Sequence, residues 1–519
     1  MSSTDLTRDS WFTQRRLGIA VLAGGFMALA YPPFPFGFLA YICPALVLLA
    51  MRGVSPRSAA HVGFWFGTVL NTATLYWIGW VSVWGMLVIA CVLGLYVAVV
   101  FAALSYLQQR FGPRAIWLFP ILWTAHEYLR GVGDLAFPWT NFSLTQVRYL
   151  SLIQFADATG DLGVTFWVCL IVVLVYRLLE VWTSPRGRGA GVYVFPLALL
   201  FILPFVYGFQ VMEHLKDDGR VRVAVLQGDI DSYRKWSKDF VEQSFAVYET
   251  QTREAVADGA ELVVWPETAA PVYLRSEPHL KRQIVRMARE LNTHLLVGTL
   301  EYQTVSDSGY MSFNAAVAVD SSGYDPDYHA KLHLVPLGEW IPFSSHVKIL
   351  QQLEVGGAHF TEGKKLVLFD HPEGPYAAAI CFESVFPDIV RRLTVHGARF
   401  LVNITNDGWY GFSSGPTQHA LIAVYRAIET RRPIARAANT GISLFVDRRG
   451  QVHDLTDQYI PDLAVFDLGL GPRGQLTFFM RYGMYVGKLC ALASAVVLLL
   501  ALIFQRGRPR DAAMRVEGG

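Results

Sequence analysis

Charged side chains are scarce in this sequence, and the signatures of several common protein classes are missing. Only 17% of the 519 residues are charged, whereas soluble proteins have about 25%, and 53% are hydrophobic. This composition excludes a largely disordered chain and an ordinary soluble globule. The 44 Lys and Arg exceed the 42 Asp and Glu by only two. Such a small net charge gives no positive field that would indicate a nucleic-acid partner.

Metal-ligand spacings, phosphate-binding glycine loops, internal repeats and low-complexity stretches are also missing. We therefore predict neither a metal nor a bound cofactor. What the sequence does contain is long apolar stretches, with a mean hydropathy of +0.33. Part of the chain is therefore expected to lie in lipid.

Eight apolar runs approach the roughly 20 residues that a membrane-spanning helix needs. Residues 31–35 alone separate the first two runs, which are short and form either two tilted spans or a re-entrant hairpin. The first run also resembles a signal peptide, but the next apolar run follows at once, with no polar mature start. The runs are residues 17–30, 36–51, 58–78, 86–107, 115–129, 162–175, 191–211 and 486–504.

Arginines near the ends of these runs predict their orientation. Five clusters fall on one side of an eight-segment count, whereas the connections 31–35 and 80–85 carry no charge. The clusters begin at Arg8, Arg52, Arg110, Arg186 and Arg506. Because positive loops remain in the cytoplasm, both termini are predicted to be cytoplasmic and the long polar stretch to be exported. We expect a seven-segment membrane domain over residues 1–212, an exported domain over 213–482, and a C-terminal membrane helix with a cytoplasmic tail over 483–519.

The exported stretch reads as a layered α/β domain. Adjacent strand-like runs without intervening helices indicate a mixed sheet. Strands are predicted at residues 221–226, 262–265, 295–297, 315–319, 377–380, 400–404 and 442–446, and helices at 241–258, 279–292 and 419–430.

Cys381 is the only thiol of this predicted exported domain, because the other cysteines lie inside apolar runs, at Cys43, Cys91, Cys169 and Cys490. An unpaired thiol is unusual in an oxidising compartment. Cys381 directly follows the predicted strand 377–380, and α/β sheets place their chemistry at strand ends. The sequence therefore favours a nucleophile, with a buried inert cysteine as the alternative.

Two other stretches supply the groups that a cysteine nucleophile needs. The groups needed are a proton acceptor, a cation that favours the thiolate, and donors for the oxyanion. Pro266 ends a buried strand, so Glu267 projects at the strand exit. Lys331 opens a stretch that runs to residue 342 and contains Glu339. Either Glu267 or Lys331 alone would read as an ordinary surface charge.

Taken together, these stretches resemble the nitrilase superfamily of carbon-nitrogen hydrolases, which carry a Glu-Lys-Cys triad in this chain order on an αββα sandwich. More closely, the chain resembles the apolipoprotein N-acyltransferase family of bacterial inner membranes, over nearly its whole length. The matching stretches are residues 265–267, 331–342, 381–383, 406–411, 416–419, 426–430 and 439–441. Leu337, Phe382 and Gly408 depart from the Phe, Tyr and Ala expected in relatives.

The resemblance implies roles for the residues of these stretches. Cys381 becomes the nucleophile, Glu267 the general base and acid, and Lys331 the cationic donor to the oxyanion, with the backbone N–H of Phe382 as a second donor. Glu339 is expected to orient Lys331. Glu383 is expected to support the site. Both acids could equally be structural.

The resemblance also implies the substrates and the location. A fatty acyl chain would pass from a membrane phospholipid to Cys381 as a thioester, and then to the α-amino group of the N-terminal diacylglyceryl-cysteine of an apolipoprotein. The catalytic domain would lie in the periplasm, at the surface of the bacterial inner membrane. Trp236, Trp340 and Trp409 suit such an interface, although core packing is the alternative for each. Asn406 is a further candidate for substrate binding.

Polar residues also mark the membrane half, namely Glu127, Arg130, Asp161 and the stretch 138–141. They are expected to support lipid head groups or the joint between the two halves. A membrane-tethered amidase that uses water as acceptor, and a transporter with an exported ligand-binding domain, are the alternative functions. A tether needs only one helix, and a transporter should carry paired charges near the bilayer midplane, which are almost absent here.

Overall fold

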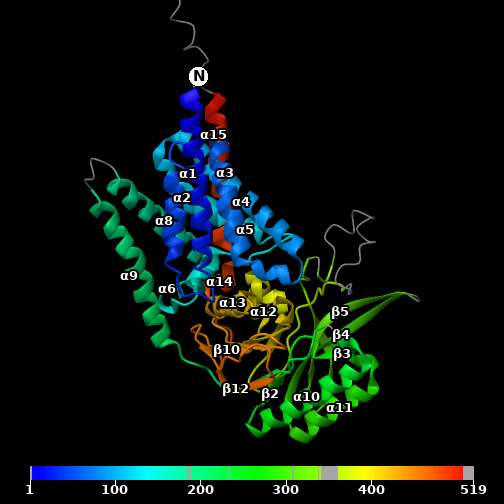
Figure 1. Cartoon of the computed structure of the whole chain (residues 1–519). Helices are drawn as coiled ribbons and strands as arrows, with labels where there is room; N and C mark the ends of the chain where they lie inside the picture. The colour runs from blue at the N-terminus through cyan, green and yellow to red at the C-terminus, as the bar shows by residue number, and fades with distance from the viewer. Residues whose placement is uncertain are drawn as a thin grey trace, which may run out of the picture.

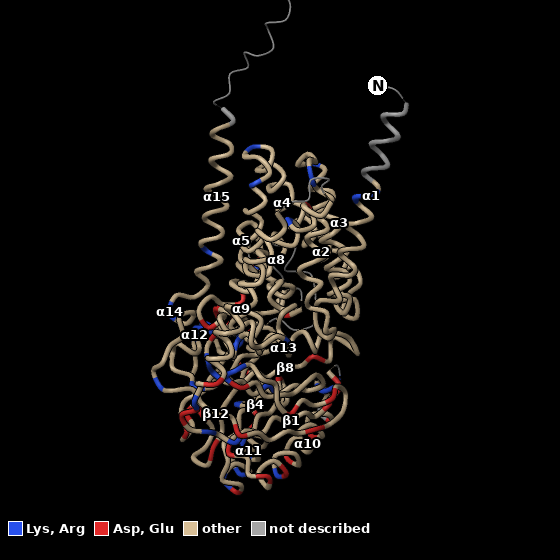
Figure 2. Tube along the Cα trace, turned by 90° about the vertical axis from the view of Figure 1, so that its left-hand side faces the viewer, with Lys and Arg blue, Asp and Glu red and all other residues tan. Residues whose placement is uncertain are grey.

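The computed structural model describes residues 3–183, 189–232, 234–306, 309–336, 338–340 and 360–506. Figure 1 shows two halves, with a helical bundle above a layered α/β sandwich. The start of α1 and the end of α15 both lie at the end of the bundle remote from the sandwich, in Figure 1 and in Figure 2.

Each of the eight apolar runs overlaps one helix of the bundle. These helices are α1 (Ser3–Ala28), α2 (Leu39–Ala50), α3 (Pro56–Thr74), α4 (Val83–Phe111), α5 (Phe119–Arg130), α8 (Asp161–Trp182), α9 (Gly191–His214) and α15 (Tyr485–Arg506). Within the described residues, four of them are long and apolar enough to cross a membrane, namely α4, α8, α9 and α15. By length and composition, the described residues therefore support four candidate spans, fewer than the eight that the sequence predicts.

The remaining bundle segments are short or partly polar. A 12-residue helix such as α2 is about 18 Å long, which is less than the roughly 30 Å hydrocarbon core. Short helices connect the longer ones: η1 (Tyr76–Trp80), η2 (Pro113–Leu118), η3 (Phe142–Gln146), α6 (Leu150–Ile153) and α7 (Ala156–Thr159). The peptide bond between Pro32 and Pro33 is cis.

The surface of the bundle is apolar, as expected of segments that face lipid. Helix α9 stands apart from the other helices in Figure 1 and exposes large side chains such as Leu203 (62%) and Phe209 (57%). Helix α15 likewise exposes Leu492 (63%). Figure 2 shows that acidic side chains lie almost entirely in the sandwich, whereas the far end of the bundle carries mainly Lys and Arg. This distribution matches a bundle whose far end lies at a positive-inside boundary.

The sandwich contains two sheets that pack face to face. The first has the strand order β12-β1-β2-β4-β5-β6, with β3 paired to β4, and the second has the order β11-β10-β9-β8-β7. The strands of the first sheet are β1 (Arg220–Gln227), β2 (Leu262–Val264), β3 (Ala270–Tyr273), β4 (His294–Ser306), β5 (Gly309–Val319), β6 (Tyr324–Ala330) and β12 (Asp462–Gly469). Those of the second are β7 (Tyr376–Ile380), β8 (Phe400–Thr405), β9 (Ile434–Ala438), β10 (Leu444–Val446) and β11 (Val452–His453).

Helices cover the outer faces of both sheets and give an αββα order of layers. Helices α10 (Lys238–Ala257) and α11 (Pro278–Leu291) cover the first sheet on the side away from the bundle (Figure 1). Helices α12 (Pro387–His396) and α13 (Ser414–Thr430) cover the second sheet on the side of the bundle. All the strands predicted from the sequence are present, whereas β3, β6, β9, β11, β12 and α12 were not predicted.

The two halves meet through a buried polar joint on α13. The side chain of Gln418 accepts hydrogen bonds from Trp77 Nε1 (3.2 Å) and Trp139 Nε1 (2.9 Å) and donates to the carbonyls of Pro32 and Thr74 (3.2 Å each). One glutamine of the sandwich thus binds three separate segments of the helical half.

The polar residues that mark the membrane half are buried and hydrogen-bonded, and Asp161 binds a residue of α13. Arg130 is only 7% exposed and donates to Thr140 Oγ1 (2.7 Å) and Asn141 Oδ1 (2.6 Å). The backbone N–H of Asp161 donates to Glu429 Oε1 of α13 (2.8 Å). Glu127 is 1% exposed and accepts from Trp123 Nε1, Thr165 Oγ1 and the N–H of Phe142.

Candidate active site

The strand ends bring Cys381 to a sharp turn at the edge of the second sheet. Cys381 directly follows β7 and opens the short helix η7 (Cys381–Val385). Its φ of +52° lies in the left-handed region, which side chains other than glycine rarely adopt. The residue is 7% exposed.

Glu267 and Lys331 reach the same place from the first sheet. Glu267 follows β2 after Trp265 and Pro266, and Lys331 follows β6 directly. Their side chains are almost fully buried, and Lys331 Nζ lies 3.2 Å from Glu267 Oε1 and 2.7 Å from Glu339 Oε1. The structure thus brings together the Glu, Lys and Cys that the sequence singles out.

Glu383 connects the two strand ends. One carboxylate oxygen accepts a short hydrogen bond from the N–H of Leu332, directly after Lys331, and the other accepts from the N–H of Ile380, directly before Cys381. His329 Nε2 lies 3.3 Å from the second oxygen. Glu383 therefore fixes the backbone next to Lys331 and next to Cys381, and in this way supports the site.

Asn314 is a site residue that the sequence reasoning missed. Its side-chain amide donates to Glu267 Oε1 (2.7 Å) and to Glu339 Oε1 (3.2 Å). Its backbone carbonyl accepts from the N–H of Lys331 (2.9 Å). Asn314 interrupts the otherwise apolar stretch 313–319 of β5. A single polar residue in such a strand is the signal that could have revealed it.

The charges around the thiol determine its protonation. Burial raises the pKa of Cys381, and the carboxylate of Glu267 raises it further, whereas Lys331 lowers it by a smaller amount. The resting side chain is therefore a neutral thiol, because Lys331 favours the thiolate less than burial and Glu267 disfavour it. Burial alone would lower the pKa of Lys331, but Glu267 and Glu339 outweigh burial and raise it. Lys331 is accordingly a permanent cation.

A second buried lysine, also missed, lies close to Glu267. Lys235 is 2% exposed and its ammonium donates a short hydrogen bond to Thr268 Oγ1, on the residue after Glu267. Burial lowers its pKa from 10.5 to about 8, and the attraction of Glu267 opposes this change. Lys235 belongs to η4 (Arg234–Trp236), a loop over the site whose sequence reads as an ordinary polar turn.

The residues proposed for substrate contact differ in their surroundings. Trp236 and Trp409 are 44% and 38% exposed, so each presents part of its ring to the surface. Trp340 is partly buried, with no hydrogen-bond partner for its buried Nε1 among the described residues. Asn406 is 3% exposed and its Oδ1 accepts from Ser232 Oγ (3.1 Å) and Asn439 Nδ2 (3.3 Å). Its side-chain oxygen thus joins two loops.

Aromatic rings from both halves pack around Phe382, the residue after the nucleophile. The ring of Phe382 stacks with those of Phe137 and Trp139 of the helical half, at centroid distances of 6.2 and 6.3 Å. His333 and Phe386 pack on the other side, with a ring separation of 4.1 Å between them. The wall is apolar, and the membrane half supplies part of it.

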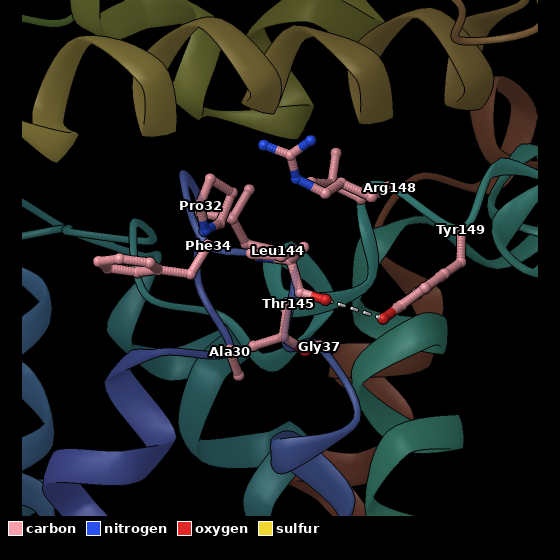
Figure 3. A pocket seen from close by; sticks show the side chains of 10 residues that line it. Ala30, Pro32, Phe34, Gly37, Leu144, Thr145, Arg148 and Tyr149 are labelled. Atoms are coloured by element: carbon pink, nitrogen blue, oxygen red, sulfur yellow. Dashed lines mark hydrogen bonds between the residues drawn. The ribbon is translucent and has the colours of Figure 1, made fainter.

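A separate hollow lies under α13, between the loop after α1 and the segment around η3. Figure 3 shows Arg148 and Phe34 among the side chains that line it, and Arg148 donates to the carbonyl of Pro33 (2.9 Å). Its empty volume is about 180 Å³. The hollow has essentially no room for the centre of a water molecule, and neither Cys381, Glu267 nor Lys331 lines it.

Comparisons with known proteins match both halves of the chain. A family model described as carbon-nitrogen hydrolase matches residues 222–471, and one described as apolipoprotein N-acyltransferase N-terminal domain matches residues 23–174.

Among curated proteins, an apolipoprotein N-acyltransferase of Geobacter metallireducens is 36% identical over 500 residues, which cover 93% of this chain and 94% of that protein. One of Chlorobaculum tepidum is 30% identical over 520 residues, covering 94% and 97%.

Among solved structures, an amidase from Nesterenkonia is 18% identical, with a TM-score of 0.36, over 48% of this chain and 90% of that chain. Nit3 of Saccharomyces cerevisiae, a member of the nitrilase superfamily, is also 18% identical, with a TM-score of 0.38, over 49% and 91%.

Proposed function

The chain belongs to the apolipoprotein N-acyltransferase family, and from this premise we propose how its residues carry out acyl transfer. It is an N-acyltransferase with a carbon-nitrogen hydrolase domain. The proposal concerns the roles of Cys381, Glu267 and Lys331, the two lipid substrates, and the placement of the site at the membrane.

In the first half-reaction, Glu267 takes the thiol proton while Cys381 Sγ attacks an acyl ester carbonyl of a membrane phospholipid. The ammonium of Lys331 and the backbone N–H of Phe382 stabilise the oxyanion of the tetrahedral intermediate. When the intermediate collapses, the C–O bond breaks and Glu267 returns the proton to the leaving lysophospholipid oxygen. The product is a thioester on Cys381, with Glu267 again a carboxylate.

In the second half-reaction, the α-amino group of a diacylglyceryl-cysteine at the N-terminus of an apolipoprotein attacks the thioester. Glu267 takes a proton from the attacking nitrogen and delivers it to the sulfur as the C–S bond breaks. The neutral thiol reforms, in agreement with the raised pKa of Cys381. Cys381, Glu267 and Lys331 thus serve both half-reactions. The sulfur is the nucleophile in the first and the leaving group in the second.

The observation that carries this proposal is the meeting of three strand ends. Lys331 Nζ lies 3.2 Å from Glu267 Oε1, and the charges of both groups act on the Cys381 thiol. The apolar wall of Phe382, Phe137 and Trp139 supports acyl transfer over hydrolysis, because it keeps water from the thioester. A site whose wall comes partly from a lipid-facing bundle also suits two substrates that are anchored in the bilayer.

The proposed placement follows the sequence prediction. Residues 1–212 and 483–519 would supply eight membrane segments, with both termini in the cytoplasm. Residues 213–482 would form the catalytic domain in the periplasm, on the bacterial inner membrane. The apolar surfaces of α9 and α15 and the separation of charges in Figure 2 support this arrangement.

The test is acyl transfer from a phospholipid to a synthetic diacylglyceryl-peptide by the purified full-length protein. Cys381→Ala should abolish transfer, Glu267→Gln should lower it by about 10²- to 10⁴-fold, and Lys331→Met by about 10²- to 10³-fold. Cys91→Ala, at an exposed thiol of α4, is the matched control and should leave the rate unchanged. Release of free fatty acid without transfer would instead indicate a hydrolase, and full activity of Cys381→Ala would overturn the proposal.

A further inference from the structure

The backbone of the nucleophile is held in a conformation that it would not adopt by itself. Cys381 has a φ of +52°, and a residue with a Cβ is strained in this region. Such strain persists only where surrounding contacts over-determine the conformation. The contacts at the Cys381 carbonyl are therefore informative, because this carbonyl lies on the strained residue itself.

Two side chains lie at this carbonyl. Ser384 Oγ donates to the Cys381 carbonyl oxygen at 3.0 Å, and His419 Nε2 lies 3.2 Å from the same oxygen. Ser384 Oγ and His419 Nε2 are also 3.2 Å apart. His419 is on α13, directly after Gln418 of the joint, and the ring of Trp139 packs on it at a centroid distance of 5.2 Å.

The other side of the histidine ring is fixed by a buried ion pair. Asp407 Oδ1 lies 2.9 Å from His419 Nδ1, and Asp407 Oδ2 accepts from Arg436 at 2.7 Å. All three side chains are fully buried. Burial alone would raise the pKa of Asp407, but Arg436 and His419 lower it to about 2. Asp407 is therefore a carboxylate that can only accept, and His419 Nδ1 lies between this acceptor and an Arg436 nitrogen at 3.1 Å.

One hydroxyl group and one ring nitrogen thus meet at the Cys381 carbonyl. Burial and the charge of Arg436 lower the pKa of His419, so its ring is neutral. Ser384 donates its hydroxyl hydrogen to the carbonyl, and His419 Nε2 lies 3.2 Å from both oxygens. The connectivity matches a Ser-His-Asp triad. However, Ser384 is 4% exposed and faces a backbone carbonyl, so it does not act as a second nucleophile.

We propose that His419, oriented by Asp407, is a positioning residue for the nucleophile, and that it acts together with Ser384 on the carbonyl of Cys381. The pair holds the strained turn and thereby aims the thiol at the acyl carbonyl, next to Glu267 and Lys331. This inference rests on the proposed role of Cys381. It assigns a function to the stretches 406–411 and 416–419, which the triad leaves unexplained.

The contact with Trp139 extends the argument to the membrane half. The ring that packs on His419 comes from the segment that follows α5, and the neighbouring Gln418 binds the Nε1 of the same tryptophan at 2.9 Å. A residue of the helical half therefore buttresses the ring that holds the nucleophile.

The test separates positioning from folding with two readouts on the full-length protein. Ser384→Ala removes the hydroxyl without adding bulk, and His419→Phe keeps the ring volume but removes both nitrogens. Each should lower kcat of acyl-enzyme formation from phospholipid by about 10- to 100-fold, with KM changed less than about twofold. Each should also slow alkylation of Cys381 by iodoacetamide, a small reagent that needs only a well-placed thiol.

The double variant distinguishes a shared role from two independent ones. Because both side chains act through the same carbonyl, Ser384→Ala with His419→Phe should lose no more than the stronger single variant. His453→Asn is the matched control, because His453 Nε2 also lies near a carboxylate, Asp447 Oδ2 (3.4 Å), on β11. It should leave both rates unchanged.

The outcomes bear separately on the two proposals. If Cys381→Ala abolishes transfer but Ser384→Ala, which has the smaller risk of misfolding, leaves kcat and the alkylation rate unchanged, the positioning role is overturned and the triad stands. Multiplicative losses in the double variant would also overturn it. If Cys381→Ala retains transfer, the proposed function itself fails.

Discussion

Cys381 is buried among groups of both charges, and this decides how its thiol reacts. Burial and Glu267 raise its pKa more than Lys331 lowers it. A thiol in this environment stays protonated at neutral pH, so the proton moves to Glu267 only as the sulfur attacks. The protonated thiol is thus protected at rest, and it can still react with a bound ester.

The raised pKa gives a prediction for the pH dependence of alkylation. The rate of Cys381 modification by iodoacetamide should still rise with pH above about 9, past the ordinary thiol pKa of about 8.5. Lys331→Met should slow it further at each pH, because removal of the cation raises the thiol pKa again. The modification is measured by mass spectrometry of the Cys381 peptide. A plateau below about pH 8 would contradict the neutral thiol.

Lys235 should cost stability and support activity. Its folded pKa of about 8 lies below its ordinary value of 10.5, so the unfolded chain binds the proton more tightly. This penalty is fully present below pH 8 and disappears as the pH rises toward 10.5. At pH 7, Lys235→Met should therefore stabilise the fold, by at most about 3 kcal/mol from a shift of roughly two units.

The same substitution should lower activity, because the ammonium interacts electrostatically with Glu267 and binds the residue after it. Lys281→Met, at a lysine on the outer helix α11, is the control and should change activity little. Thermal unfolding in detergent and acyl-transfer rates give the two readouts. A Lys235→Met protein that is less stable yet fully active would contradict this account.

Residue types at strand ends could be predicted from the sequence, but their partners could not. Glu267 and Cys381 each follow a predicted strand, whereas Lys331 follows β6, which was not predicted, and was singled out by the stretch 331–342. Asn314 and Lys235 were missed because their importance depends on which strands become neighbours. No spacing in the chain shows that Asn314 of β5 faces Glu267, 47 positions away.

At the scale of the elements, the strands that were missed have identifiable reasons. Strand β9 contains Arg436, whose charge hides a fully buried strand until its contact with Asp407 is known. Strand β6 carries Pro326 and two aspartates, a pattern that favours a turn. Helix α12 has a proline at its start and Gly397 after its end, which are readable signals, but its 10 residues are too few for clear periodicity.

Helix α13 joins the two halves, and Gln418 tests that joint. Gln418→Ala would leave the buried Nε1 groups of Trp77 and Trp139 without their acceptor, at a cost of about 1 to 3 kcal/mol. The melting temperature should fall, and acyl transfer should fall with it, because His419 is the next residue. Gln243→Ala on the exposed face of α10 is the control. Unchanged melting and unchanged activity would show that the joint does not depend on Gln418.

At the scale of the whole molecule, the number of membrane segments is the part least determined by sequence. Hydropathy marks eight runs, yet within the described residues only α4, α8, α9 and α15 are long and apolar enough to span by themselves. The short α2 shows why: it begins after Pro35 and ends at Ala50, so its 12 residues are too few for a full span. Helix packing in the bundle, which hydropathy does not report, decides how such short segments are accommodated.

The orientation is tested by labelling single cysteines in intact cells. Ser321→Cys, on an exposed turn of the sandwich, should react with a membrane-impermeant maleimide added outside the inner membrane. Ser58→Cys, near the start of α3 at an arginine cluster, should react only after the membrane is opened. Both substitutions are made in a Cys91→Ser background. Exchange of the two labelling patterns would reverse the proposed topology.

The most direct measurement of the central claim is a chase of the acyl-enzyme. The protein is incubated with a phospholipid of defined acyl chain, separated from free lipid, and digested for mass spectrometry. We predict one fatty acyl group on the Cys381 peptide, labile to hydroxylamine. A diacylglyceryl-peptide added to the separated acyl-enzyme should then gain that acyl group on its α-amine as the Cys381 adduct disappears. Transfer to the peptide with Cys381 never acylated, or an adduct that the peptide cannot remove, would contradict the claim.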